Sequence, residues 1–156
     1  MSSVDAVPAH HHDDARDLLP NAHAPYSNFP VAAIVVTTAG ATFAGVNVEN
    51  AAYGSTICAE RMAIGAMVTA GDRSGIAAVV VAGRADDPLS PCGSCRQVIA
   101  EFSSPATVVS SRGAAGTTAT WQVNELLPVA FGPLALHAGT GSSAAPGPPE
   151  PPRDSE

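Results

Sequence analysis

Lysine is absent from this sequence, and all seven of its basic residues are arginine. A P-loop nucleotide site needs a lysine on the phosphates, and a pyridoxal enzyme needs one for its Schiff base, so both chemistries are excluded. Aromatic residues are also scarce, at 4% of the chain, so each large ring is a candidate for a specific role. No apolar run approaches the about 20 residues that a membrane-spanning helix requires.

Positive charge is in deficit, and the net charge is −7. An acidic chain repels phosphate backbones, and no basic patch is visible. We therefore expect a small neutral substrate, with neither a nucleic acid polymer nor a membrane as partner. The first residues lack the charged start and apolar run of a signal peptide. We expect a cytoplasmic location, where the three cysteines stay reduced and form no disulfide.

The length of 156 residues suits one hydrophobic core. Residues 1–12 show no periodicity, and residues 139–156 are rich in proline, glycine and serine. Such segments cannot bury enough apolar surface to offset the entropy of ordering. We predict a single domain over residues 13–138 between two disordered ends. The histidines at positions 10–12 are interpreted as part of a solvated tail that binds metal at most adventitiously.

Hydrophobic patterning predicts alternating strands and helices. A short first helix begins at Asp13 or Asp14 and continues toward Asn21, with Pro20 breaking or kinking it. Strands are expected at residues 30–38, 41–48, 76–82, 107–111 and 118–123, and helices at 58–70, 92–102 and near Asn124. The segment 76–82 is apolar throughout and is expected to be central. The order predicts an α/β fold with helices packed on a mixed sheet.

The three cysteines fall at two predicted helix starts. Cys58 opens one helix, and Cys92 and Cys95 form a C-x-x-C at the next, where Ser90 is the expected N-cap and Pro91 the first helical residue. Free backbone N–H groups and the helix dipole favour thiolates there, and thiolates bind zinc. Three protein ligands leave one tetrahedral position open, as in catalytic zinc sites. His23 and His137 lack metal-ligand spacing and are interpreted as surface or packing residues.

Glu60 follows Cys58 by two residues, within reach of the open side of such a metal. A carboxylate beside zinc-activated water is a hydrolytic pair. A lone glutamate in a first turn is usually only a complement to the helix dipole, and a C-x-x-C alone also fits a redox pair. The combination of Cys-Ala-Glu with Pro-Cys-x-x-Cys is typical of zinc deaminases.

At these motifs the sequence resembles the small homotetrameric cytidine deaminases. The similarity covers roughly residues 22–133 and consists of five ordered segments. They are residues 24–31 (APYSNFPV), 45–53 (GVNVENAAY), 56–61 (TICAER), 91–97 (PCGSCRQ), and 126–128 with 131–133 (LLP, FGP). The resemblance implies a three-layer α-β-α fold with a five-stranded mixed sheet and helices on both faces.

The resemblance also implies roles for individual residues. Cys58, Cys92 and Cys95 would hold one Zn²⁺ per subunit, and Glu60 would transfer protons from water to the pyrimidine. Substrate contacts are implied for Phe29 on the base and for Asn47 and Glu49 on the ribose. Ala51, Tyr53 and Phe131 would reach a neighbouring subunit's site in a homotetramer with shared sites. Around the metal, we expect at least one of Arg61 and Arg96 to offset thiolate charge by hydrogen bonding sulfur. Gln97 is also expected to lie among the residues that surround the metal ligands.

The implied activity is hydrolytic deamination of cytidine and deoxycytidine, as in pyrimidine salvage. The nearest alternative is a deaminase of a modified cytosine nucleoside, such as a blasticidin-type antibiotic, against which the paired ribose residues argue. A polynucleotide-editing deaminase conflicts with the acidic charge. A non-catalytic zinc-binding interaction module would need neither an open coordination position nor Glu60.

Overall fold

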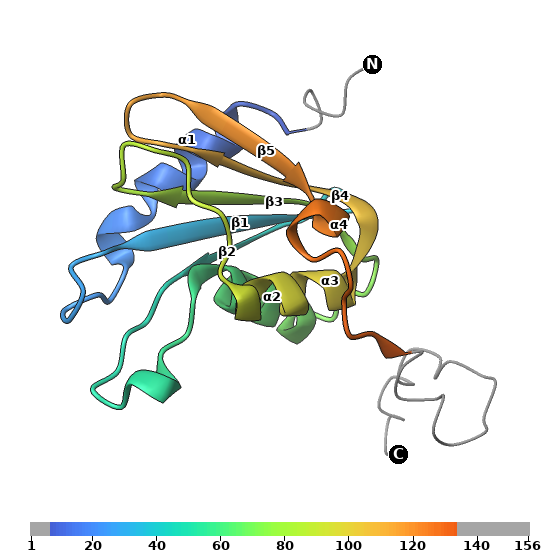
Figure 1. Ribbon diagram of the computed structural model, residues 1–156, viewed down its shortest axis with the longest axis horizontal. Coiled ribbons are helices and arrows are strands. Elements are labelled where there is room, and N and C mark those ends of the chain that lie inside the picture. Colours follow the sequence, from blue (N-terminus) through green and yellow to red (C-terminus); the bar gives the residue numbers. More distant parts are fainter. Residues whose placement is uncertain (1–6, 134–156) are drawn as a thin grey trace, which may run out of the picture.

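The computed structural model describes residues 7–133. The strands are β1 (Val31–Thr37), β2 (Thr42–Val46), β3 (Ile76–Gly83), β4 (Ser103–Arg112) and β5 (Thr118–Gln122). The helices are α1 (His10–Asp17), α2 (Ala59–Thr69), α3 (Gly93–Phe102) and α4 (Val123–Leu126), with 3-10 turns η2 (Leu19–Asn21) and η3 (Tyr53–Ser55). The strands form one sheet in the order β2-β1-β3-β4-β5 (Figure 1). The predicted mixed five-stranded α/β sheet is therefore confirmed.

Strand β3 lies at the centre of the sheet, as its continuous apolar sequence predicts. It pairs antiparallel with β1 and parallel with β4, while β2 and β5 pair antiparallel with β1 and β4. The connection from β3 to β4 passes through α3, as a parallel pair requires a crossover. Because both faces of β3 are covered, nearly every residue in it is buried.

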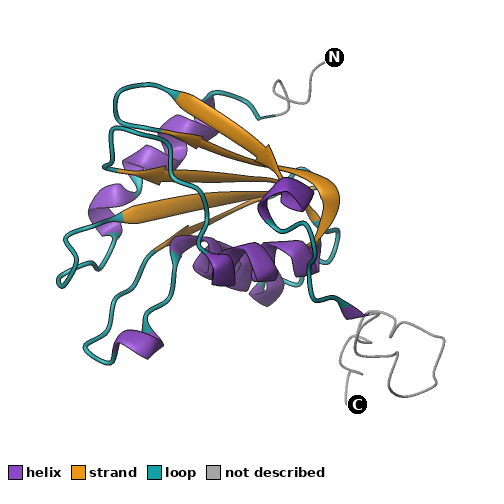
Figure 2. Cartoon of the chain, viewed as in Figure 1, coloured by secondary structure: helices purple, strands orange, loops and turns teal. Residues whose placement is uncertain are grey.

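Helices cover both faces of the sheet, which gives three layers (Figures 1 and 2). Alternate residues of β1 point to opposite faces: Ala33 and Val35 join the larger core, which also contains residues of α2, α3 and α4. Ile34 lies in a smaller core with Ala15 of α1 and with residues of β3. The two cores explain why both central strands are apolar throughout rather than alternating.

Helix α2 lies unusually close to the edge strand β2, and Gly45 makes this approach feasible. A Cβ atom at position 45 would meet the backbone of Ala59 and Ala63 and would lie 2.9 Å from the Cβ of Met62. Contacts that close do not occur between real side chains and a helix backbone. The absence of a side chain at Gly45 therefore sets the position of the first turn of α2.

The first helix begins earlier than predicted, at His10 rather than at Asp13 or Asp14. His11 and His12 are buried, so residues 10–12 are part of the fold and not of a solvated tail. His12 Nε2 lies 3.2 Å from the Ser110 hydroxyl of β4, and burial lowers its pKa. The α-helix stops at Asp17, and Pro20 lies in the 3-10 turn that follows, as expected for a helix breaker.

Two further boundaries differ from the prediction. Cys92 rather than Ser90 is the N-cap of α3, and Pro91 precedes the helix. The reason is that Arg96 donates from Nε to the Pro91 carbonyl at 2.8 Å, which holds residues 90–91 outside the helix. Strand β4 starts at Ser103 instead of Thr107, with an irregularity in its pairing to β3. Within it, the Ser104 N–H donates to the Thr107 hydroxyl.

The predicted disordered tail at residues 139–156 lies outside the described residues, as does His137. Among residues 7–133, no helix has the length and apolar character needed to span a bilayer.

Replacing Gly45 with alanine should destabilise the protein by about 2 kcal/mol or more, since an overpacked side chain forces α2 away from the sheet. Gly65→Ala is the matched control, because Gly65 lies in the exposed interior of α2 with no atom near its missing Cβ. That change should stabilise the helix by about 0.5–1 kcal/mol. Thermal denaturation of the two variants measures the difference, and equal melting temperatures would contradict the packing role of Gly45.

Candidate metal centre and active site

The three cysteines meet where α2 and α3 begin. Strands β2 and β3 are both antiparallel to β1, so they run in the same direction and their carboxyl ends reach the same edge of the sheet. The helices that follow them start at this edge and contact each other. Cys58 and Cys92 are the N-caps of α2 and α3, and Cys95 lies in the first turn of α3. The predicted convergence of the cysteines on one point is therefore confirmed.

The spacing of the sulfurs fits a tetrahedral metal ion. The Sγ atoms of Cys58 and Cys92 are 3.9 Å apart, and all three sulfurs lie within 4.8 Å of one another. Two thiolates bound tetrahedrally at about 2.3 Å from zinc are separated by about 3.8 Å. Small rotations of the cysteine side chains would bring the sulfur–sulfur distances to those of a tetrahedral zinc site. No fourth protein ligand joins the group among the described residues, so a tetrahedral ion held by these cysteines would have one position left for another ligand.

The thiols differ in their proton affinity. Burial raises the pKa of Cys58 and, together with the nearby Glu60 carboxylate, raises that of Cys95 much further. Burial acts in the same direction at Cys92, but hydrogen bonds from the Cys95 backbone and the neighbouring thiols outweigh it and lower the pKa. Because metal ions bind thiolates, zinc binding here displaces thiol protons.

Glu60 lies beside the cysteines in a closed part of the site. It is 4% exposed, in the first turn of α2. A cavity of about 200 Å³ joins it to two of the cysteines and to the ring of Phe29, and is completed by Val31, Asn47, Thr56, Ala59, Val81, Leu89 and Ser90. The site thus combines a metal-binding group, a buried carboxylate and an aromatic wall in a space the size of a small planar ring.

The predicted ribose-binding residue Asn47 holds the segment that carries Phe29. Its Oδ1 accepts from the Val31 N–H at 2.9 Å, and its Nδ2 donates to the Phe29 carbonyl at 3.0 Å. These two hydrogen bonds are made by a side chain that is nearly fully buried. Just before Phe29, Asn28 has a left-handed backbone (φ 53°), a conformation that asparagine tolerates better than most residues. Together these features fix the backbone on both sides of Phe29, which lines the cavity.

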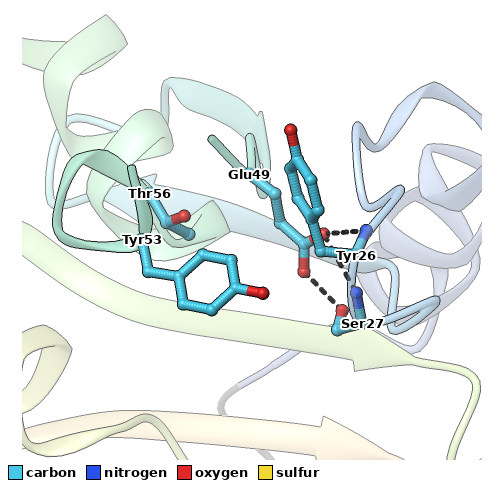
Figure 3. A pocket seen from close by; sticks show the side chains of 5 residues that line it. All are labelled: Tyr26, Ser27, Glu49, Tyr53 and Thr56. Atoms are coloured by element: carbon cyan, nitrogen blue, oxygen red, sulfur yellow. Dashed lines mark hydrogen bonds between the residues drawn. The ribbon is translucent and has the colours of Figure 1, made fainter. Parts of the chain in front are cut away.

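Glu49 is held by the turn that precedes Phe29 (Figure 3). Its Oε2 accepts from the backbone N–H of Tyr26 at 2.8 Å and of Ser27 at 3.2 Å, and its Oε1 accepts from the Ser27 hydroxyl. The Ser27 hydroxyl bond, followed by the two backbone bonds, lowers the pKa of Glu49, so the carboxylate is ionised at neutral pH. Sequence reasoning did not predict a role for Ser27, although it stands in the same APYSNFPV segment that contains Phe29.

A second open pocket adjoins the cavity that contains Glu60. It is about 380 Å³ in volume, and its lining residues, Tyr26, Ser27, Glu49, Tyr53 and Thr56, are drawn in Figure 3. Thr56 lines both spaces, so the two pockets lie next to each other. The Tyr26 and Tyr53 rings are 5.9 Å apart in an edge-on arrangement. This layout fits a ligand with one planar end and one hydroxylated end.

The residues expected to serve a neighbouring subunit, Ala51, Tyr53 and Phe131, are exposed on the surface. Ala51 and Tyr53 are on the long loop between β2 and α2, and Tyr53 is 75% exposed. Phe131 is 60% exposed, and the Gln97 side-chain amide donates to its carbonyl at 2.7 Å. Gln97 therefore supports the C-terminal segment that carries Phe131.

Both arginines hold the chain around the cysteines rather than the sulfur atoms themselves. Arg61 donates to the Thr56 carbonyl at 2.9 Å, two residues before Cys58. Arg96 donates to the carbonyls of Pro91 and Leu126. Each arginine thus fixes the segment that leads into a helix: Arg61 holds the segment before α2, and Arg96 holds the segment before α3. The expected hydrogen bond to sulfur is not among the contacts of either arginine in the described structure.

Comparison with known proteins gives a consistent result. The family model described as "Cytidine and deoxycytidylate deaminase zinc-binding region" matches residues 9–111. A cytidine deaminase from Sporosarcina psychrophila is 46% identical over 110 residues, covering 70% of this chain and 80% of its own length. The crystal structure of a cytidine deaminase from Burkholderia pseudomallei is 42% identical with a TM-score of 0.76, covering 80% of this chain and 100% of that one. A Mycobacterium tuberculosis cytidine deaminase structure is 31% identical with a TM-score of 0.67, covering 79% and 95% of the two chains.

Replacing Asn47 with alanine should destabilise the protein by about 1–3 kcal/mol, because it leaves the Val31 N–H and the Phe29 carbonyl without partners. Asn21→Ala is the control, since Asn21 is exposed, and it should change stability by no more than about 0.5 kcal/mol. Urea denaturation of the zinc-bound proteins compares the two. If both variants unfold at the same urea concentration, Asn47 does not hold this segment.

Proposed function

The chain belongs to the cytidine and deoxycytidylate deaminase family, and from this premise we propose that it hydrolyses cytidine and deoxycytidine to uridine and deoxyuridine with release of ammonia. The observation that carries the proposal is the placement of the buried Glu60 in one small cavity with Cys58 and Cys92, two of the three thiols that can share a metal ion. A redox C-x-x-C pair would not need this third sulfur, and a structural zinc site would not need the cavity.

Zinc is the cofactor, and we assign Cys58, Cys92 and Cys95 as its ligands, one ion per subunit. Bound zinc lowers the pKa of a water molecule and so supplies the nucleophile near neutral pH. The protein's part would be to hold the ion through the three cysteines and to leave the carboxylate of Glu60 beside it in the cavity.

Glu60 is the proposed proton carrier. In the reaction a C4–O bond forms and the C4–N bond to the amino group breaks. The Glu60 carboxylate accepts a proton from the attacking water and delivers it to N3 of the ring, which makes C4 electrophilic. It then takes a second proton from the new C4 hydroxyl and gives it to the amino nitrogen, so that the C4 carbonyl forms and neutral ammonia leaves rather than an amide anion. A single carboxylate performs all these transfers, so its place beside the metal group is essential.

Phe29 and Glu49 are proposed to bind the two ends of the nucleoside. The Phe29 ring lines the cavity and presents an apolar face to the flat base. Glu49 lies in the adjoining open pocket, where the sugar would lie. Its carboxylate accepts three hydrogen bonds from residues 26–27 and has about four acceptor positions, which leaves capacity for a ribose hydroxyl. The main contribution of Asn47 to the site is to position Phe29. A hydrogen bond from Asn47 to the ribose would be a second contribution.

The comparisons favour an ordinary cytosine nucleoside over a modified antibiotic nucleoside, because the named relatives are cytidine deaminases. The net charge of −7 argues against a polynucleotide substrate. We place the activity in cytoplasmic pyrimidine salvage and assign it to one deaminase domain over residues 13–138, extended at its start by the helix turn from His10.

We further propose a homotetramer in which neighbouring subunits complete each site with Ala51, Tyr53 and Phe131. Large apolar side chains are exposed around the pocket and at the described C-terminal end, including Tyr53, Val129 and Phe131. An aromatic-poor chain that exposes such groups is expected to bury them against another protein surface.

Glu60→Gln should abolish deamination, lowering kcat by at least about a thousandfold, since the amide cannot transfer protons. Its zinc content should stay at one ion per chain. Ultraviolet absorbance of cytidine, ammonia release and elemental analysis provide the measurements. Glu101→Gln, an exposed change on α3, should keep full activity. Wild-type turnover in the Glu60 variant would remove this residue from the mechanism.

The shared site predicts complementation between two inactive variants. Phe131→Ala and Glu60→Gln should each form homotetramers with little activity. Co-expressed, they should give mixed tetramers in which some sites combine an intact Glu60 from one subunit with an intact Phe131 from another. Native mass spectrometry identifies the mixed species, and the deamination assay reports their recovery. Mixed tetramers without regained activity would show that each site is built from one chain.

A further inference from the structure

A second group of metal-ligating side chains lies at the start of α1. His10, His11 and Asp14 each place a ligand atom within 4.8 Å of the others. Positions 10 and 14, and positions 11 and 14, are one helical turn apart, so their side chains share one side of the helix. We propose that these three residues form a second binding site for a divalent transition metal ion, separate from the cysteine centre.

The state of His11 is the independent observation that points to a ligand. His11 is 8% exposed, and its Nδ1 atom is buried with no hydrogen-bond partner in the described structure. The nearest acidic atom is Oδ2 of Asp14 at 3.6 Å, too far for a hydrogen bond. Buried polar atoms are nearly always paired. A cation between His11 and Asp14 would satisfy both the ring nitrogen and the carboxylate.

The donor set indicates the kind of ion. Imidazole and carboxylate ligands suit Zn²⁺, Ni²⁺ and Cu²⁺. With bonds of about 2.0–2.2 Å, two ligands of one ion are at most about 4.4 Å apart. The side chains of His10 and Asp14 are exposed and free to rotate by the small amount that is needed. The buried His11 is fixed and would act as the anchor, with water completing the coordination.

The location indicates a stabilising rather than a catalytic role. Helix α1 covers the face of the sheet opposite to α2 and α3 (Figure 1), above the small core of Ala15, Ile34, Val80 and Ala82. His12, in the same turn, contacts Ser110 of β4. A metal ion joining residues 10, 11 and 14 would fix the first turns of the helix that closes this core. Binding to the native state alone raises stability with metal concentration.

Isothermal titration of the enzyme carrying one zinc ion per chain with further ZnCl₂ tests the proposal. We expect one additional zinc ion per chain. His10→Ala and Asp14→Asn should each weaken its binding by about tenfold or more, as expected for loss of one ligand. Asp17→Asn is the matched control, because it removes an exposed carboxylate from the same helix outside the group, and it should bind the second ion as the wild type does. None of these residues lies in the cysteine site, so cytidine turnover should be unchanged in all three.

A thermal measurement gives a second readout that is independent of the proposed activity. Added zinc should raise the melting temperature of the wild type and of Asp17→Asn but not of Asp14→Asn. The proposal is overturned if no second ion binds, if both ligand variants bind it unchanged, or if the Asp17 variant loses it equally.

Discussion

The site depends on two helix N-termini meeting at one edge of the sheet. The common direction of β2 and β3 brings the starts of α2 and α3 to that edge, and the missing side chain at Gly45 lets α2 come close enough. Both N-termini place unpaired backbone N–H groups and a positive dipole end beside the sulfurs, which offsets part of the thiolate charge. The metal centre is therefore a consequence of how the two helices are packed.

The substrate side of the site depends on a different set of bonds. The chain between residues 26 and 31 has no regular structure, and polar side chains from the segment after β2 hold it in place: Asn47 bonds to it on both sides of Pro30, and Glu49 bonds to Tyr26 and Ser27. Asn47 and Glu49, which we propose as ribose contacts, thus also hold the segment that carries Phe29. If the proposed contacts are made, a mutation in this pair disturbs the binding of the base as well as that of the sugar.

The face of the sheet that α1 covers is stabilised differently from the face that carries the site. Its core is small, and α1 is joined to the sheet partly through polar contacts, among them Arg16 Nη2 donating to the carbonyls of Arg112 and Gly113. The three consecutive histidines belong to this helix, and His11 and His12 are buried against the rest of the domain.

The sequence by itself determined the elements and the chemistry of the site. Continuous apolar character identified β3 as the central strand, and the Cys-Ala-Glu and Pro-Cys-x-x-Cys motifs indicated the three cysteines that lie close together and the carboxylate beside them, because both signals are local in the chain. Tertiary structure alone decided the rest. The burial of His11 and His12, the capping of α3 by Cys92 and the hydrogen bonds of Asn47 and Glu49 all arise from contacts between segments that local patterning does not relate. Propensity and spacing describe a residue's neighbours along the chain, whereas these properties depend on its neighbours in space.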